Sequence, residues 1–251
     1  MPDYPAKWSD DQADFDLLGE DADFLAVGKP AGLLVHPTKP GGPRTLWDGL
    51  RELLGYELIN GGQVSIINRL DRETSGVVVV AKTRSAARLA GVAMEAREVG
   101  KSYTAIVFGW PEWDEMRVDA PILRRGEVMA SEVYLERMVH TSGASALTQF
   151  HVLRRGSCDR GRFSIIHAIP QTGRTHQIRL HLAHLGFPVL GDKLYAKGSH
   201  WYLKFIHTGW TPELEAALWL PRHALHCSEM AIAGRIWRCP LPGDLLAFSM
   251  T

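Results

Sequence analysis

The sequence has little of several features that mark particular classes of protein. It contains only three cysteines, Cys158, Cys227 and Cys239, at wide spacings. An odd, scattered set does not make a disulfide framework and is typical of reduced thiols in a cytosol. No apolar run approaches the roughly 20 residues of a membrane-spanning helix. The acidic N-terminus also lacks the regions of a secretory signal. We therefore expect a cytoplasmic protein with no membrane partner.

Net charge is also absent, since Lys+Arg and Asp+Glu number 28 each among 251 residues. There is thus no global field to attract a nucleic acid, although a basic cleft can lie opposite an acidic surface. The sequence has no G-x-x-x-x-G-K-[ST], G-x-G-x-x-G, H-E-x-x-H or G-x-S-x-G motif. His176, His181 and His184 have no acidic ligand at helical spacing. We expect neither a nucleotide cofactor nor a metal.

Apolar runs, turns and caps predict one domain of many strands and a few helices. A polar, acidic tail is expected over residues 1–18 and the domain over residues 19–251. Predicted strands cover residues 24–27, 33–35, 77–81, 103–108, 150–153 and 163–169. A basic turn at residues 154–156 joins the last two, and a hairpin surrounds Gly234. One helix is predicted after the N-cap Thr45, and another over residues 175–185, before Gly186. A third is predicted over residues 85–99, with Gly100 as the stop and with an apolar side formed by Leu89, Val92, Ala93 and Ala96.

Asp71 is the first candidate for chemistry. It lies in Asn68-Arg69-Leu70-Asp71-Arg72, ahead of four consecutive valines. A lone aspartate in such a loop usually caps a turn. The buried strand predicted after it would instead hold Asp71 on a rigid element, as a nucleophile requires. From these residues alone both interpretations stay open.

A second candidate is the helix predicted from Thr175. Arg179 lies at the margin of its apolar stripe, and a partly buried arginine needs an anion. His176 shares its side of the helix. A solvated helix edge explains these residues equally well. Tyr103 lies in the predicted strand 103–108, where tyrosine is usually a packing residue.

Taken together, these segments resemble the RluA-type family of RNA pseudouridine synthases. The matching stretches are Lys29-Pro30-Ala31-Gly32-Leu33-Leu34-Val35-His36-Pro37, Asn68 to Gly76, Lys101 to Gly109, Pro170 to Arg179 with Gly191-Asp192 beyond it, and Leu225-His226. The resemblance spans about residues 18 to 240. It departs from the family at Asn68, where histidine is usual. Asparagine keeps a hydrogen bond but cannot titrate.

The resemblance implies a fold and a reaction. The fold is α+β, with a mixed, mostly antiparallel central sheet flanked by helices, here as a stand-alone catalytic domain. Asp71 would attack a uridine, detach the base from its sugar and allow re-attachment through carbon, without a cofactor. Arg179 would keep the Asp71 carboxylate ionised. Tyr103 would offer a stacking face and a hydroxyl for proton transfer.

The implied partner is structured rRNA or tRNA, bound by a monomer. The target base must be flipped out of the RNA, and Arg69 would fill the vacated space. Further RNA contacts are expected from Arg72, Arg174 and His176, and from a loop carrying Arg124 and Arg125.

Two other functions remain open. One is an RNA-binding or chaperone module that keeps the fold without the reaction. The retention of Asp71, Tyr103 and Arg179 disfavours it, since a pure binder needs no buried aspartate. The other is an enzyme acting on small molecules, which would show no affinity for RNA.

Overall fold

The computed structural model describes residues 15–250, which fall into two compact units. The Asp71 unit comprises residues 15–101 and 226–241, and the Arg179 unit comprises residues 102–225 and 242–250. The sequence predicted a single domain over residues 19–251. Of the tail predicted over residues 1–18, residues 1–14 lie outside the described part, whereas Asp16 to Leu18 already belong to a strand.

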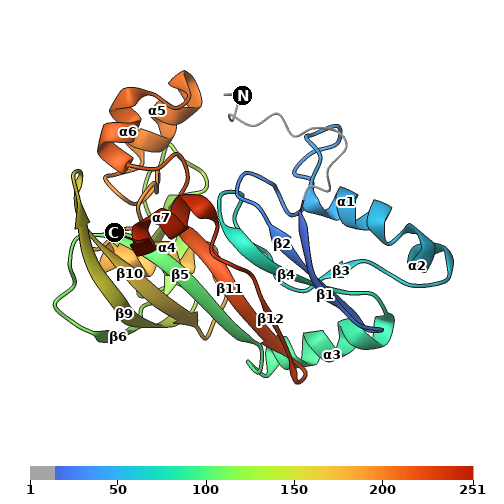
Figure 1. The fold of residues 1–251 in the computed structure, drawn as a ribbon. Helices are drawn as coiled ribbons and strands as arrows, with labels where there is room; N and C mark the ends of the chain where they lie inside the picture. The colour runs from blue at the N-terminus through green and yellow to red at the C-terminus, as the bar shows by residue number, and fades with distance from the viewer. Residues whose placement is uncertain (1–14, 251) are drawn as a thin grey trace. The chain divides into compact units, whose positions relative to one another are not determined.

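The Asp71 unit is a mixed sheet with three helices (Figure 1). Its strands run in the order β1-β2-β4-β11, with β3 on β4 and β12 on β11. The pairing of β4 with β11 is parallel, and the other pairings are antiparallel. The elements are β1 (Asp16–Glu20), β2 (Phe24–Lys29), α1 (Leu46–Leu53), α2 (Gly55–Ile59), β3 (Ser65–Ile66), β4 (Ser75–Ala81), α3 (Arg84–Glu95), β11 (Leu225–Ile232) and β12 (Arg235–Arg238).

Strand β4 is the centre of this unit. Every one of its residues is buried, as the run of β-branched residues predicts for a strand covered on both faces. Gly76 has φ 118°, and a Cβ added there would lie 2.1 Å from the carbonyl oxygen of Cys227. Only glycine therefore allows β11 to approach β4 at this register.

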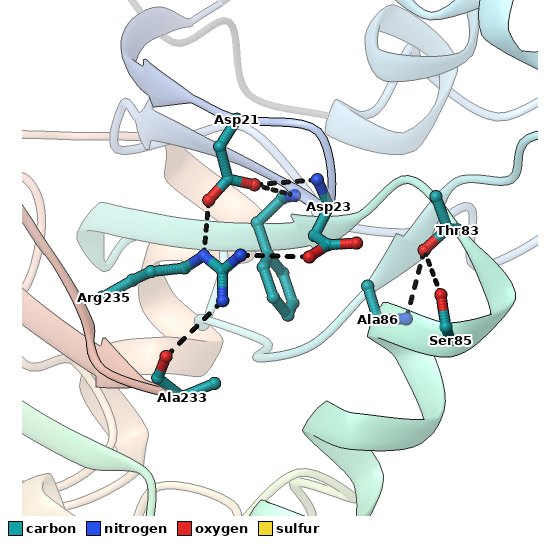
Figure 2. Close-up of polar contacts among 8 residues, drawn as sticks. Asp21, Asp23, Thr83, Ser85, Ala86, Ala233 and Arg235 are labelled. Atoms are coloured by element: carbon teal, nitrogen blue, oxygen red, sulfur yellow. Dashed lines mark hydrogen bonds and ion pairs between the residues drawn. The ribbon is translucent and has the colours of Figure 1, made fainter.

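An ion cluster ties the start of β12 to the turn before β2 (Figure 2). The Arg235 guanidinium donates to the carboxylates of Asp21 and Asp23 and lies 5.0 Å from the centre of the Phe24 ring. Asp21 also accepts from the backbone amides of Asp23 and Phe24, both at 2.8 Å. Burial raises the pKa of Asp21, but these hydrogen bonds outweigh it and hold the pKa below its ordinary value.

The Arg179 unit contains an antiparallel sheet in the order β5-β10-β9-β6 and a separate β7–β8 pair. Helix α4 packs against β8, β9 and β10. The first two residues of β5 and all but the first of β11 are assigned to the Asp71 unit. The elements are β5 (Gly100–Phe108), β6 (Glu115–Asp119), β7 (Ile122–Arg124), the 3-10 helix η1 (Arg125–Glu127), β8 (Arg137–Val139), β9 (Leu147–Cys158), β10 (Gly161–Pro170), α4 (Gln177–His184), α5 (His200–Thr208), α6 (Pro212–Leu218) and α7 (Gly243–Met250).

The predicted fold class, α+β with mostly antiparallel strands and flanking helices, is confirmed. Thr45 precedes α1 as predicted, with its amide and hydroxyl donating to Asp48 at 2.9 and 2.7 Å. The hairpin around Gly234 is formed by β11 and β12. Within residues 15–250 no helix is long and apolar enough to cross a membrane.

Two predicted elements were wrong. Residues 33–35 form no strand, because the carbonyl oxygens of Leu34 and Val35 accept from the first amides of α1 instead. The turn predicted at residues 154–156 lies inside β9, where Gly156 pairs with Phe163. The chain turns at residues 159–160 instead, and Gly161, whose φ is 135°, begins β10 opposite Cys158.

Two predicted helices differ in their bounds and one in its buried face. Helix α3 ends at Glu95, not at Val99, and Arg97 takes the left-handed φ of 60°. Its predicted apolar residues Leu89 and Val92 are exposed, since smaller alanines face β4. Helix α4 begins two residues later than predicted, because His176 has a left-handed φ of 59°.

Candidate active site

The turn that carries Asp71 leads directly into β4. Leu70 before it and Thr74 after it are buried, and the Thr74 amide donates to the Asp71 carbonyl oxygen at 3.1 Å. Asp71 itself is half-buried, whereas the sequence predicted a buried aspartate. Its backbone is therefore fixed by a rigid element while its side chain stays partly accessible.

Lys29 fastens this turn to the end of β2. Its side chain is only 1% exposed. The ammonium donates to the carbonyl oxygens of Pro30, Leu33 and Arg72 at 2.8, 2.9 and 3.1 Å. The same turn is held by two bonds with Gly32, whose amide donates to the Arg72 carbonyl at 2.8 Å and whose carbonyl accepts from Arg72 Nε at 3.0 Å. The first matching stretch of the sequence is thus a brace for the Asp71 turn.

Asn68, the departure from the family pattern, has a structural place. It is 5% exposed. Its amide nitrogen donates to the Val77 carbonyl and its amide oxygen accepts from the Val79 amide, both at 2.9 Å. The side chain thus forms the same kind of hydrogen bonds with the β4 backbone that a neighbouring strand would form. Neither bond needs a side chain that can gain or lose a proton, as histidine can.

His226 braces the other side of β4. One ring nitrogen lies 2.9 Å from the Ser75 hydroxyl and the other 3.0 Å from the carbonyl oxygen of Cys239. Residues around Asp71 are therefore held from β2, from the loop before β4 and from β11.

Arg69 and Arg72, both predicted RNA contacts, have exposed side chains. The pKa of His36 lies below its ordinary value, mainly because the ring is partly buried and also because of the positive charge of Arg69. The guanidinium of Arg72 is partly used within the turn, as described above.

In the Arg179 unit, the side chain of Arg179 forms a buried ion pair with Asp192. Its Nε and one Nη donate to the two carboxylate oxygens at 2.7 and 2.9 Å. The two side chains are 6% and 0% exposed. Burial raises the pKa of Asp192, but the charge of Arg179 outweighs it and the pKa lies below its ordinary range. Arg179 was predicted at the margin of the apolar stripe of the helix and partly buried. It is more fully buried than that, at 5% exposed, and Asp192 is the anion that allows this burial.

Tyr195 connects Arg179 to strand β8. The guanidinium carbon of Arg179 lies 5.2 Å from the centre of the Tyr195 ring. The Tyr195 hydroxyl lies 2.8 Å from His176 Nδ1 and accepts from the Arg137 amide at 3.0 Å. His176, predicted as an RNA contact, is partly buried and contacts Tyr195; its contact with RNA stays a prediction.

Tyr103 lies on β5 opposite Ala168 of β10 and is 8% exposed. The structure assigns the predicted site residues to two units. The Asp71 unit holds Asp71, Arg69 and Arg72, and the Arg179 unit holds Tyr103, Arg124, Arg125, Arg174, His176 and Arg179.

The loop arginines differ in their partners. Arg125 pairs with the buried carboxylate of Glu136 at 3.2 Å. Arg124 and Arg174 line one pocket, together with Arg137. Sequence reasoning named Arg124, Arg125 and Arg174 but could not separate their roles.

Sequence reasoning also missed Lys29, Asp192 and Tyr195 as supporting residues. Lys29 and Asp192 stand inside the stretches that carry the family resemblance, which was the available signal. Neither the lysine after the predicted strand nor the aspartate after Gly191 belongs to a periodic pattern, so the sequence does not indicate that either is buried with a partner. Tyr195 gave no signal at all.

His181, one of the three histidines considered above for a metal, is a core residue. It is fully buried, with Nδ1 2.9 Å from the Thr148 hydroxyl and Nε2 2.9 Å from the Ala120 carbonyl oxygen. Burial lowers its pKa. Over the described residues, no group of three or more His, Cys, Asp or Glu is placed to hold a metal ion.

Comparisons with known proteins agree on one family. The profile of the RNA pseudouridylate synthase family matches residues 23–184, more than half of the chain. The chain is 35% identical over 243 residues to ribosomal large subunit pseudouridine synthase D of Nitrosomonas europaea, covering 92% of the chain and 63% of that protein. It is 36% identical over 186 residues to the mitochondrial tRNA pseudouridine(32) synthase of Saccharomyces cerevisiae, covering 74% of the chain and 38% of that protein.

Among solved structures, the chain is similar to human RNA pseudouridylate synthase domain containing 4. The TM-score is 0.68 at 25% identity, over 92% of the chain and 90% of that structure. The chain spans less than two thirds of the length of the two curated relatives named above.

Proposed function

Because the chain belongs to the RNA pseudouridylate synthase family, we propose that it isomerises uridine to pseudouridine in RNA. One of its relatives is named for the large ribosomal subunit and another for tRNA. We propose a structured rRNA or tRNA as the substrate. The glycosidic carbon–nitrogen bond breaks and a carbon–carbon bond forms, so the product has the mass of the substrate and no oxidant or reductant is needed.

Asp71 is the proposed nucleophile. The observation that carries this assignment is the rigid turn that presents it. The Asp71 backbone is fixed by Thr74, by the brace from Lys29 and by entry into β4, while its side chain is half-buried. A loop aspartate that only capped a turn would not need this support from β2. A carboxylate that is already held in place loses little rotational freedom when it attacks, which lowers the activation barrier of the reaction.

Arg179 is the proposed cation that keeps the Asp71 carboxylate ionised, by resemblance to the family. Its ion pair with Asp192 supports this role, because that pair fixes the position of the guanidinium. A pre-oriented cation stabilises charge without reorganising during the reaction.

Tyr103 and Arg69 complete the proposal. A target base held in folded RNA is inaccessible, so it is flipped out at a cost of about a few kcal/mol. Tyr103 offers a face for the flipped base and a hydroxyl for proton transfer. Arg69, whose side chain is exposed, fills the space that the base leaves.

An RNA-binding module without catalysis is the rival function. It predicts binding to the same RNA with no change in its uridines. The test is to map pseudouridines in rRNA and tRNA from cells with and without this protein. One or more sites that vanish without it, and return with the wild-type gene, support the enzyme. An unchanged map in both RNA classes overturns it.

A further inference from the structure

A basic pocket of about 410 Å³ opens beside the β7–β8 pair in the Arg179 unit. Its walls come from β7, η1, the start of β8, the turn at residues 142–144 and the loop before α4. Three arginines line it, Arg124, Arg137 and Arg174, with one carboxylate from Glu127 and one aromatic ring from Tyr134. The volume lies within the range of small-ligand pockets.

The charge of this pocket is largely uncompensated. Arg124 Nε is 3.6 Å from the nearest oxygen of Glu127. The side chains of Arg137 and Arg174 donate to backbone carbonyl oxygens, which carry no net charge. Three guanidinium groups thus meet a single carboxylate, and the pocket favours an anion.

The pairing of β7 with β8 is a second indication that the pocket binds an anion. Arg124 and Arg137 are register partners across the antiparallel β7–β8 pair. Like charges directly opposite each other destabilise such a pair. A neutral partner would suit folding better at either position, so the arrangement indicates that a ligand meets both charges.

The pocket also contains a stacking surface. Tyr134 is 73% exposed, although a large aromatic ring is usually more buried. The guanidinium carbon of Arg124 lies 4.5 Å from the centre of its ring. Arg124 therefore orients the ring from one side, and most of the ring surface stays accessible to a base.

The frame of the pocket is fixed before any ligand arrives. Glu136, which is 6% exposed, accepts from Arg125 and from the Ser131 hydroxyl at 3.2 and 2.8 Å. The Arg137 amide donates to Tyr195 at 3.0 Å. Arg125 thus serves the frame through Glu136, and the pocket charge comes from the other arginines.

We propose that this pocket binds one unpaired nucleotide of the substrate RNA. The base stacks on Tyr134, and the adjoining phosphates meet Arg124, Arg137 and Arg174. This assignment rests on the proposed function and adds a subsite that reads a single-stranded feature of the RNA. Phosphate contacts fix position, whereas stacking selects an unpaired base over a duplex.

The test is a binding titration with a short single-stranded oligoribonucleotide, and with inorganic polyphosphate as an anion that has no bases. The proteins are the wild type, Tyr134→Ala, Tyr134→Phe, Arg137→Gln, and the control Arg117→Gln. Arg117 is an exposed residue of β6 that does not line the pocket. Thermal melting of each variant verifies folding.

Tyr134→Ala should weaken oligonucleotide binding about 5- to 150-fold, since one stacked base is lost, while Tyr134→Phe and the control match the wild type. Polyphosphate binding should not respond to Tyr134→Ala. Arg137→Gln should weaken the binding of both ligands. For the oligonucleotide, the slope of log affinity against log salt concentration should become shallower by about 0.7.

Equal oligonucleotide affinity of wild type and Tyr134→Ala overturns the nucleotide site, as does an equal loss of polyphosphate binding in that variant. The proposed function is judged separately, by pseudouridine formation in the wild type. If the wild type isomerises uridine and the variants bind normally, only the pocket assignment fails.

Discussion

Replacing Lys29 by methionine tests the brace under the Asp71 turn. Methionine has a similar length and no polar donor. The change leaves the carbonyl oxygens of Pro30, Leu33 and Arg72 without the ammonium that they now share. Because Lys29 is 1% exposed, water does not easily replace it.

The expected loss follows from two opposing terms. Hydrogen bonds from a charged donor contribute about 1.5–3 kcal/mol each, which gives roughly 5–9 kcal/mol for the three. Burying an ammonium ion costs several kcal/mol, and the variant no longer bears that cost. We expect a net loss in the free energy of unfolding of about 2–4 kcal/mol, or roughly 4–16 °C in melting temperature for a chain of this size.

The assay compares thermal melting and turnover for Lys29→Met with those of Lys39→Met, an exposed lysine in the following loop. Lys29→Met should melt lower and turn over more slowly even at temperatures where it is fully folded, because the turn carrying Asp71 is looser. Lys39→Met should match the wild type in both. A Lys29→Met protein with wild-type melting and turnover would refute the brace.

Two further predictions concern ion pairs. Arg179→Met should lower the free energy of unfolding by about 3–5 kcal/mol in urea unfolding, because it leaves Asp192 buried without its cation. A double-mutant cycle with Asp71→Asn measures any coupling between Arg179 and the proposed nucleophile, and simple additivity of the two losses contradicts that coupling. The lowered pKa of Asp21 contributes stability above its unfolded pKa of about 3.9 that is lost as pH falls through the folded value. Urea unfolding should therefore show Arg235→Gln less stable than wild type at pH 7, with the gap closing below about pH 4, and a constant gap contradicts this.

The sequence predicted the elements whose patterns are local. The valine run of β4 and the cap at Thr45 are set by neighbouring residues, and both were found. The boundary of α4 was missed because a left-handed residue, His176, gives no sign in its side-chain type. The turn predicted at residues 154–156 failed because Gly156 is required by the ring of Phe163 across the strand pair, not by a turn.

The supporting contacts of the candidate site were beyond the sequence for a different reason. The bonds from Lys29 to Arg72 and from Arg179 to Asp192 join residues far apart along the chain or across a turn. Their energies come from burial, which sequence patterns indicate only on average. The family resemblance located the residues that were proposed to react, and the structure added those that hold them.

The most direct test of the proposed mechanism is the turnover of purified Asp71→Asn. Its substrate is RNA from cells lacking the protein, with uridine labelled by tritium at carbon 5, the position that loses hydrogen as the new carbon–carbon bond forms. Asparagine has the shape of aspartate, but its neutral amide is a far weaker nucleophile than a carboxylate. The account predicts tritium release by the wild type and none by the variant, with melting temperature and RNA affinity nearly unchanged. Appreciable release by a folded Asp71→Asn protein would contradict the assignment of Asp71 as the nucleophile.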